Sequence, residues 1–510
     1  MPGRLRPRTG WPEAGQTPTE YRREFSVPTL QRNSSPRILI LGAGSSGLAG
    51  QRALQKRGIH ADVVEMGSRV GGLWVFENDN QRSAAYASLT IDTSHPRSAF
   101  SEFPYPEGTP DYPSHRQVAE YFQAYATHFE LERFIRFRSE VVQVKPVQGD
   151  SPVLRVMVRD LSSGQITESL YDAVIVANGH HFAPSLPPGH PLPTFSGEAF
   201  HSHSYRNPKA PIDCRGKRVC VVGIGNSAVD IASELTEHAS EVTLSVRRGA
   251  WVLPKYLFGK PLDQGGAISP WLPAWLRRRL STFAIRWLVG NMKDFGLPKP
   301  DHRVGEAHPT VSDKLLPLLR AGKIRVRGPI EAAEGRKVSF GPLPGLSDSA
   351  EPLLEDVIVY CTGYRIAFPF FADDFISAHG NRLPLFGRVF HPDAPRVFFL
   401  GLAQTLGAIF PTVERQANWL AEYLSGTYNL PESELMRRAI ETDEAARGAR
   451  YVRSPRHTMQ LDPEAFSSFL RRELEAGRKR AQAGVGVPFG KSDRTPPSAQ
   501  TNPEPSSRLG

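Results

Sequence analysis

The chain has 510 residues, of which 40% are hydrophobic, and a formal net charge of +10 at pH 7. This length exceeds one ordinary core and predicts two or three domains. Because no run of eighteen or more apolar residues and no apolar leader is present, we expect neither a transmembrane helix nor a secretory signal. Three scattered cysteines, Cys214, Cys220 and Cys361, argue against a disulfide framework and favour a reducing, cytoplasmic setting.

The excess positive charge is concentrated in one region. Residues 271–330 carry twelve Lys and Arg against four Asp and Glu. No nucleic-acid-binding motif accompanies them, and they lie close to the second of two glycine motifs. A polyanionic cofactor explains this local basic field more simply than DNA or RNA.

The first glycine motif follows the apolar run 37–41. Its residues are Gly42, Ala43, Gly44, Ser45, Ser46 and Gly47, and an alanine- and leucine-rich segment follows. This order of strand, glycine loop and helix is the dinucleotide-binding fingerprint, in which a pyrophosphate approaches a helix N-terminus. Glu65 stands about twenty residues further on, where a carboxylate accepts hydrogen bonds from an unmodified ribose. We therefore predict an FAD site here.

The second glycine motif follows the apolar run 218–222. It consists of Gly223, Ile224, Gly225, Asn226, Ser227 and Ala228. Alanine at the third glycine position is tolerated if helix and strand lie slightly farther apart. Arg247 and Arg248 end the next predicted strand, and guanidinium groups there favour a 2′-phosphate. The motif predicts an NADPH site, although the arginine pair is also compatible with a solvated surface turn.

Two later segments, 171–179 and 356–363, have the pattern of a buried strand that ends in a glycine turn. Each closes one dinucleotide unit, so the predicted fold class is α/β, with two Rossmann-like dinucleotide-binding domains and the NADPH domain inserted into the FAD domain. The expected order is a flexible tail at 1–36, the first part of the FAD-binding domain at 37–186, the NADPH-binding domain at 187–352 with a helical insertion near 255–300, the second part of the FAD-binding domain at 353–430, a C-terminal helical segment at 431–482 and a flexible tail at 483–510.

Between the two fingerprints the chain matches a longer signature, FxGxxxHxxxY. Its specified positions are Phe195, Gly197, His201 and Tyr205, and further matching blocks are 71–74, 101–104, 308–312 and 362–364. On these residues the chain resembles the flavin-containing monooxygenases of bacterial type, also called class B flavoprotein monooxygenases, over roughly residues 36–425.

The resemblance implies a reaction and further cofactor contacts. NADPH would reduce FAD, NADP⁺ would stay bound, and dioxygen would give a flavin C4a-hydroperoxide that oxygenates a small lipophilic amine or sulfide, as in N,N-dimethylaniline oxygenation. Such a site must be dry, and the protein supplies orientation rather than acids and bases. The resemblance also assigns Gly72, Leu73 and Trp74 to a second FAD contact.

One departure from the family pattern concerns Asp92. Many members carry an asparagine near the flavin at this place, whereas here residues 88–94 contain Asp92 followed by Thr93. An amide donates and accepts hydrogen bonds, but an ionised carboxylate only accepts. Asp92 must be protonated to donate, or must accept from a ribose hydroxyl. It is the only candidate catalytic side chain, and a turn-capping role remains the alternative.

The histidines invite functional interpretations that we do not favour. His201 lies in a linker, where a lone histidine more often packs structurally than acts as a base. His180 and His181 are interpreted as turn residues close to the cofactor, without the spacing of metal ligands. We expect no metal site.

Two further segments with helical patterns lie outside the fingerprints. Leu272, Leu276, Leu280, Phe283 and Trp287 have helical spacing, with Arg277, Arg278, Arg279 and Arg286 mainly elsewhere. We interpret this helix as a cap that lines the substrate entrance, with contact to a membrane surface as the alternative. Near residue 410, a glycine turn precedes a long predicted helix. The N-terminus of this helix would face the flavin. Alternatively, Glu414 and Gln416 would only be solvent-exposed residues of the helix.

Other functions remain to be distinguished. The pair Tyr205-Arg206 stands where the related Baeyer–Villiger ketone oxygenases typically show tryptophan followed by Pro or Asp, which favours N- or S-oxygenation. A disulfide reductase would need a Cys-x-x-Cys pair, which the sequence lacks. An uncoupled NADPH oxidase and a nucleotide-sensing module without turnover stay open. Oligomeric state cannot be read from the sequence.

Overall fold

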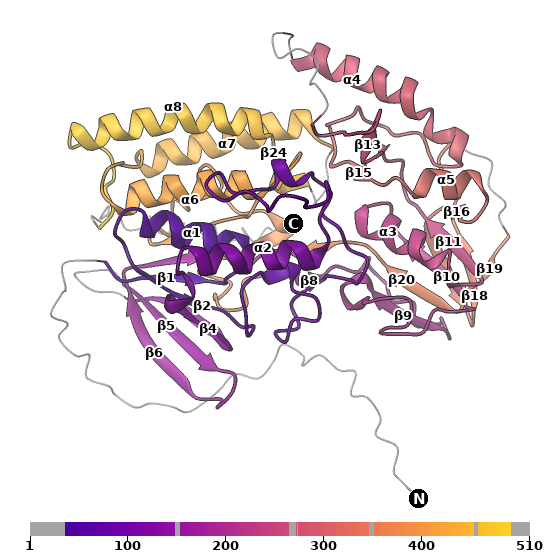
Figure 1. Cartoon of the computed structure of the whole chain (residues 1–510), viewed down its shortest axis with the longest axis horizontal. Helices are drawn as coiled ribbons and strands as arrows, with labels where there is room; N and C mark the ends of the chain where they lie inside the picture. Colours follow the sequence, from indigo (N-terminus) through magenta and orange to yellow (C-terminus); the bar gives the residue numbers. More distant parts are fainter. Residues whose placement is uncertain are drawn as a thin grey trace, which may run out of the picture. The chain divides into compact units, whose positions relative to one another are not determined.

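A computed structural model describes residues 36–147, 153–264, 272, 274–345, 351–452 and 457–490. The predicted N-terminal tail lies outside these residues except for Pro36, and so does the chain beyond residue 490. Within the described ranges, two parallel sheets form the framework (Figure 1).

The first sheet has five parallel strands in the order β22-β7-β1-β2-β3. They are β1 (Ile38–Leu41), β2 (Ala61–Val64), β3 (Ile135–Arg136), β7 (Ala173–Val176) and β22 (Val397–Phe399). The strands β1 and β7 are buried at every position. Continuous apolar runs of this kind are typical of parallel strands covered on both faces.

Alternate residues of β1 define the two layers around this sheet. Ile38 and Ile40 pack into a core with helices, whereas Leu39 and Leu41 pack against an antiparallel sheet. The helices are α1 (Ser45–Gln55), α2 (His115–His128), α6 (Phe410–Leu424), α7 (Ser433–Arg450) and α8 (Pro463–Gln482). The antiparallel strands are β4 (Ser139–Val147), β5 (Val153–Asp160) and β6 (Ile166–Tyr171) (Figure 1).

The second sheet repeats this plan in the order β16-β11-β10-β20-β9, again all parallel. Its strands are β9 (Glu198–His201), β10 (Arg218–Val222), β11 (Glu241–Ser245), β16 (Arg325–Arg327) and β20 (Val357–Tyr360). One face packs against α3 (Asn226–Leu235) and α5 (Leu315–Arg320), and the other against β17 (Ile330–Glu334) and β18 (Lys337–Phe340), which pairs with β19 (Leu353–Leu354).

The order of the strands along the chain shows how the two sheets are connected. All strands of the second sheet fall between β7 and β22 of the first. The predicted α/β class, with one dinucleotide-binding unit inserted into the other, is therefore confirmed. The two connecting passages pair with each other through β8 (Ala183–Pro184) and β21 (Tyr364–Arg365).

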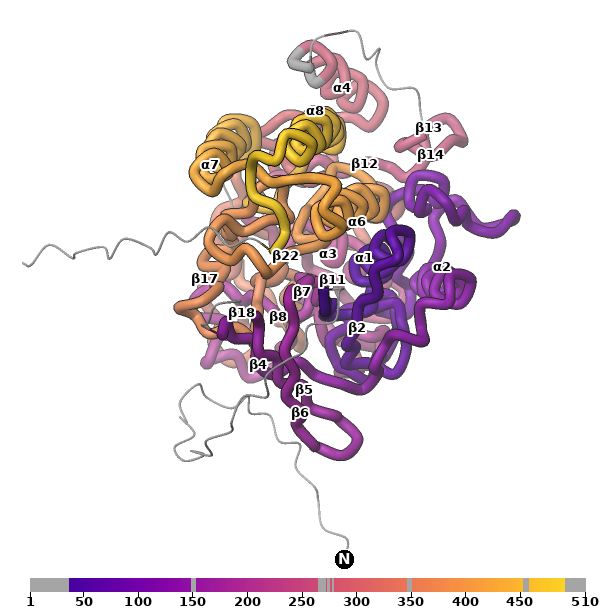
Figure 2. Tube along the Cα trace, turned by 90° about the vertical axis from the view of Figure 1, so that its left-hand side faces the viewer, coloured from indigo at the N-terminus to yellow at the C-terminus, as the bar shows by residue number. Residues whose placement is uncertain are grey.

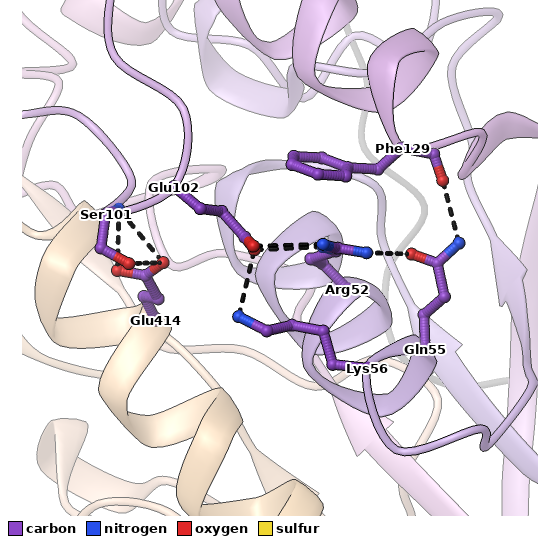
Figure 3. Close-up of polar contacts among 7 residues, drawn as sticks. All are labelled: Arg52, Gln55, Lys56, Ser101, Glu102, Phe129 and Glu414. Atoms are coloured by element: carbon purple, nitrogen blue, oxygen red, sulfur yellow. Dashed lines mark hydrogen bonds and ion pairs between the residues drawn. The ribbon is translucent and has the colours of Figure 1, made fainter.

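A polar cluster joins α1 to neighbouring segments of the first unit (Figure 3). Arg52 and Lys56 of α1 bind the Glu102 carboxylate, at 3.1 and 3.3 Å. Partial burial raises the pKa of Glu102, but the hydrogen bonds from Arg52 and Lys56 outweigh it, so the pKa lies below its usual range. Glu414 of α6 accepts hydrogen bonds from the backbone and hydroxyl of Ser101. The block at 101–104 thus ties α1 to α6.

The insertion forms a hairpin and a helix, and its exposed face differs from the predicted one. The hairpin is β13 (Tyr256–Leu257) with β14 (Lys260–Pro261), and α4 (Ala274–Val289) lies at the periphery (Figures 1 and 2). Ile285 and Val289 of α4 face the core, whereas Phe283 and Trp287 are 70% and 76% exposed. The segment is helical as predicted, but its apolar stripe faces solvent at Phe283 and Trp287, because the domain packs the other side of the helix.

The predicted C-terminal tail begins too early. After α8, the chain folds back, and Leu430 and Val487 exchange backbone hydrogen bonds of 3.1 and 2.9 Å. Residues 483–490 therefore belong to the fold. The remaining short strands are β12 (Val252–Leu253), β15 (Thr310–Val311), β23 (Gln404–Thr405) and β24 (Gln460–Leu461), and the single-turn helices are Gly72–Trp74, His95–Arg97, Glu132–Phe134, Ser202–Ser204, Met292–Phe295, His379–Asn381 and His457–Met459.

Candidate active site

A cavity of about 640 Å³ is bordered by both dinucleotide fingerprints. From the first unit it is lined by the fingerprint loop, by Gly71–Trp74, by Ile91–Thr93 and by Ala177–Phe182. From the second unit come Asn226, the adjoining Leu253 and Pro254, and the 304–311 segment, while Leu262 and Asp263 come from the insertion. Parallel strands direct their carboxyl ends to such a crevice, which is where this fold binds its ligands.

The first fingerprint is closely packed against its own backbone. A Cβ placed on Gly47 would lie 1.8 Å from the carbonyl oxygen of Gly42, so the helix α1 can approach β1 only with glycine at this position. Gly44 and Gly72 face each other, and a Cβ on Gly44 would lie 3.6 Å from the Gly72 Cα. Both glycines line the cavity. Two side-chain-free walls opposite a helix N-terminus fit an approaching pyrophosphate.

Glu65 is buried at the end of β2 and stabilises this loop. Its Oε2 accepts a hydrogen bond from the backbone N–H of Ala43 at 2.8 Å, and its Oε1 accepts one from the N–H of Gly67 at 2.7 Å. Asn80 donates a third, at 3.2 Å. Because each carboxylate oxygen has two acceptor sites, Glu65 keeps capacity for a ribose hydroxyl on the cavity side.

The remaining residues of the first site divide between loop and cavity. Gly42, Gly44, Ser45, Ser46, Glu65, Gly72, Leu73, Trp74, Asp92 and Thr93 line the cavity, whereas Ala43 and Gly47 support the loop from behind. The α6 N-terminus contributes Ile409 and Phe410 to the wall. The solvating role considered for Gln416 is wrong: it is fully buried, and its Oε1 accepts the N–H of Gly401 at 3.2 Å.

In the second fingerprint only Asn226 reaches this cavity. The other site residues predicted for this unit are not among those that line it: Gly223, Gly225, Ser227, Ala228, Arg247 and Arg248. Ala228 is buried, and its Cβ would be 3.5 Å from a Cβ on Gly223, which is ordinary contact. Arg247 and Arg248 follow β11, whose carboxyl end is in register with that of β10.

Asp92 is held at the boundary between the two units. Its Oδ2 accepts a hydrogen bond from the Asn226 amide at 2.5 Å, while its Oδ1 is buried without a partner among the described residues. Burial, followed by the negative charge of Asp230, raises the pKa of Asp92 to about 7, against the opposing effects of Lys255 and Asn226. The turn-capping alternative is not what the contacts show, because Asp92 bonds a side chain of the other unit.

The histidines behave as the structural interpretation expects. His201 is buried, its Nδ1 accepts the N–H of His203 at 3.0 Å, and its ring lies 5.3 Å from that of Tyr364. Burial lowers the pKa of His201 to about 4, as it does for His180. These rings are therefore neutral near pH 7. Within the described ranges, no group of three or more His, Cys, Asp or Glu side chains is arranged to hold a metal ion.

The structure adds residues that the sequence motifs did not indicate. Asp263 of the insertion lines the cavity and accepts hydrogen bonds from the backbone and hydroxyl of Ser94, at 2.7 and 3.0 Å. Lys255 donates to Thr90 at 2.6 Å. Neither stands in a motif, and only the fold places the insertion here. Asp230 had a signal, since it is a charged residue four positions after Asn226 on the same side of the predicted helix.

Comparisons with known proteins identify the family of the chain. The family model of flavin-binding monooxygenase-like proteins matches residues 35–471. Flavin-containing monooxygenase 5 of Mus musculus is 34% identical over 440 residues, which cover 84% of this chain and 80% of the mouse protein. The N-oxide-forming dimethylaniline monooxygenase 2 of Rattus norvegicus is 34% identical over 418 residues, covering 78% and 75%.

Solved structures share the fold at lower identity. The S-allyl-L-cysteine S-oxygenase from Allium sativum superposes with a TM-score of 0.63 at 23% identity, covering 88% of this chain and 93% of that one. The OTEMO complex with FAD and NADP gives a TM-score of 0.67 at 16% identity, covering 87% and 99%.

A cavity with a dinucleotide fingerprint on each side defines an oxidoreductase of the two-dinucleotide flavoprotein class. The chain belongs to the flavin-binding monooxygenase-like family, and it is a flavin-dependent monooxygenase.

Proposed function

We propose that the protein uses NADPH and dioxygen to oxygenate the nitrogen or sulfur of a small lipophilic amine or sulfide. The observation that carries this proposal is the single cavity reached by the FAD fingerprint and by Asn226 of the NADPH fingerprint. Its wall is largely apolar, which suits a lipophilic substrate and excludes water. FAD, when bound, supplies the oxygen chemistry.

Each fingerprint would hold its own cofactor. The FAD pyrophosphate would contact the backbone at Gly42, Ala43 and Gly44, and α1 begins directly after them with Ser45, Ser46 and Gly47. Glu65 would bind the FAD ribose. The opposite wall of the site would consist of Gly72, Leu73 and Trp74. The NADPH pyrophosphate would meet Gly223, Gly225, Asn226, Ser227 and Ala228, with Arg247 and Arg248 on its 2′-phosphate. The domain boundaries given above, from 37–186 to 431–482, are proposed on the same basis.

Asp92 is proposed as the one side chain that acts at the reacting end of the cofactors, with Thr93 beside it. It lines the cavity, and its Oδ1 is unpartnered among the described residues. When protonated, Asp92 has a hydrogen-bond donor that its ionised form lacks, and it would offer that donor to a bound cofactor.

Product analysis tests the reaction type. We expect the flavin-loaded enzyme to convert N,N-dimethylaniline to its N-oxide with NADPH consumption matching product formation. A cyclic ketone is expected to give little ester. Ester without N-oxide would establish a Baeyer–Villiger oxygenase instead, and NADPH consumption that yields only hydrogen peroxide would establish an oxidase. A flavin that NADPH fails to bleach without oxygen would indicate a nucleotide sensor.

The setting proposed for this reaction is cytoplasmic, with no nucleic-acid partner. All three cysteines are free thiols, two of them buried, which is compatible with a reducing compartment. Among the described residues, no helix has the length and apolar character to span a bilayer.

The outer face of α4 is proposed to touch an anionic membrane surface. Phe283 and Trp287 are exposed there beside Arg286, and the hairpin residue Phe258 is 84% exposed. No described α4 residue lines the cavity, so a cap at the substrate entrance does not account for this face. An apolar face flanked by arginines complements negatively charged headgroups.

Replacing Phe283 and Trp287 together with serine is expected to abolish sedimentation with vesicles that contain phosphatidylserine, while flavin content and turnover stay unchanged. Wild-type binding should weaken as salt is raised, because the arginines act through screened charge. A control replaces Leu161, an exposed leucine of the other unit, with serine. If wild-type protein ignores these vesicles at low salt, the membrane contact is excluded.

A further inference from the structure

One face of α3 presents two polar side chains to the flavin-binding unit. Asn226 and Asp230 are four residues apart in this helix, so they lie one above the other on the same side. The Asn226 amide donates to Asp92 at 2.5 Å, and the hydroxyl of Tyr86 donates to Asp230 at 2.7 Å. The segment 86–92 therefore runs along this face with two contacts, and the carboxyl groups of Asp92 and Asp230 lie close enough to interact electrostatically.

The charged groups around Asp92 and Asp230 provide less positive charge than two ionised carboxylates need to be stabilised. Lys255 faces both of them and donates to Thr90. Lys314 faces only Asp230, and Glu234 adds a further negative charge on that side. Tyr86 and Cys361 remain neutral near pH 7, because burial raises the pKa of both, that of Cys361 to about 12. Two like charges in a buried site do not both ionise easily.

The hydrogen bonds indicate where one proton resides. Asp230 accepts from the Tyr86 hydroxyl and has a second lysine nearby, and both favour its charged form. Asp92 accepts only an amide hydrogen bond, and its other oxygen is buried without a partner among the described residues. An unpartnered buried carboxylate oxygen is costly when charged, and protonation removes that cost.

We propose that Asp92 and Asp230 hold one proton between them, that the proton resides on Asp92 Oδ1, and that the charge of Asp230 keeps it there. Asp230 is thus a positioning residue that acts through Asp92. A protonated carboxyl group can both donate and accept a hydrogen bond, as an asparagine amide can. This chain therefore replaces the asparagine of many relatives with a group that imitates it only below a certain pH. The inference deepens the proposed function and rests on it for its catalytic meaning.

The direction of the pH dependence follows from the same contacts. Burial and Asp230 raise the pKa of Asp92 to about 7, so the donor is present below pH 7 and lost above it. Removing the charge of Asp230 must lower the pKa of Asp92, and the donor should then disappear at a lower pH. The pKa of Asp230 itself is also raised by burial, so the two carboxyl groups titrate as a pair.

Infrared difference spectra of the flavin-loaded, oxidised protein test this directly, without NADPH or turnover. Between about pH 5 and about pH 9, the carbonyl stretch of a protonated carboxyl group should vanish with a midpoint near pH 7 in the wild type, and it should be absent in D92N. In D230N the midpoint should fall by about one unit or more. In D92N/D230N the second substitution should change nothing further.

Three comparisons keep this test decisive. D230E retains the charge and should keep the wild-type midpoint, which also covers the case in which D230N fails to fold. E355Q identifies the signal of a separate buried carboxyl group, Glu355, whose pKa burial also raises to about 7. That signal should not move in D230N. An unchanged or higher Asp92 midpoint in D230N overturns the proposal, and so does a band that survives D92N and is not the Glu355 signal identified by E355Q.

A binding measurement adds a second readout. In the wild type, the NADP⁺ affinity of the oxidised enzyme should fall as the pH rises through about 7. In D230N this fall should begin at a lower pH. In D92N the affinity should be independent of pH in this range. If the enzyme makes no N-oxide but the infrared titration behaves as described, the proposed function fails and the shared proton stands.

Discussion

Replacing Gly47 with alanine is expected to yield a colourless protein that does not take up added FAD. The new Cβ would lie 1.8 Å from the carbonyl oxygen of Gly42, and that oxygen belongs to the backbone of the same loop. Relief requires α1 to move away from β1, which costs about 1–3 kcal/mol in packing and displaces the loop from the pyrophosphate. Visible absorbance of the purified variant after incubation with FAD measures the effect.

The second fingerprint provides the matched control. Ala228 occupies the corresponding position there, and Ala228→Gly removes a buried methyl group instead of adding one. We expect this variant to keep its flavin and to lose about 1 kcal/mol of stability from the poorer helix propensity of glycine. A yellow Gly47→Ala protein with normal flavin content would show that the loop adapts to the new methyl group. It would contradict the assignment of FAD to the first fingerprint.

Replacing Arg247 and Arg248 with glutamine is expected to raise the KM for NADPH by about 100-fold and to leave that for NADH nearly unchanged. Hydrogen bonds to charged groups contribute about 1.5–3 kcal/mol each, and every 1.4 kcal/mol is tenfold in binding. Both arginines follow β11 beside the fingerprint loop. Single variants, compared as kcat/KM for the two nucleotides, would show which guanidinium makes the main contact.

Arg286→Gln provides the control, because Arg286 is an exposed arginine of α4 outside the fingerprint. It removes one positive charge, as each single Arg247 or Arg248 variant does, and it should leave the preference for NADPH intact. If the double variant loses activity with NADPH and NADH to the same extent, the two arginines are a solvated surface turn and the phosphate is bound elsewhere.

Sequence reasoning recovers features that depend on local backbone geometry. The glycines of both fingerprints, the apolar strands around them and Glu65 are fixed by short-range requirements: a tight turn, close helix–strand packing and a carboxylate at a strand end. These requirements show in a few consecutive residues. The insertion of one unit into the other follows equally well, because the strand patterns occur in that order.

Features that depend on the meeting of distant segments could not be predicted. The periodicity of α4 shows an amphipathic helix, but it does not tell which side the domain covers, and Ile285 rather than Phe283 faces inward. Asp263 reaches the cavity only because the insertion folds back onto Ser94. The contact between Asp92 and Asn226 spans 134 residues. The roles proposed for the site residues and the domain boundaries stay predictions.

The pairing of β8 with β21 constrains how the two units can move. The chain crosses from the first sheet to the second and back, and the two crossings are joined by strand hydrogen bonds and by a bond from the Thr362 hydroxyl to the Ser185 carbonyl at 2.5 Å. A doubled ribbon bends across its flat face but resists sliding of one strand past the other. The two crossings are therefore fixed to each other, so any movement of one unit relative to the other must bend both passages together.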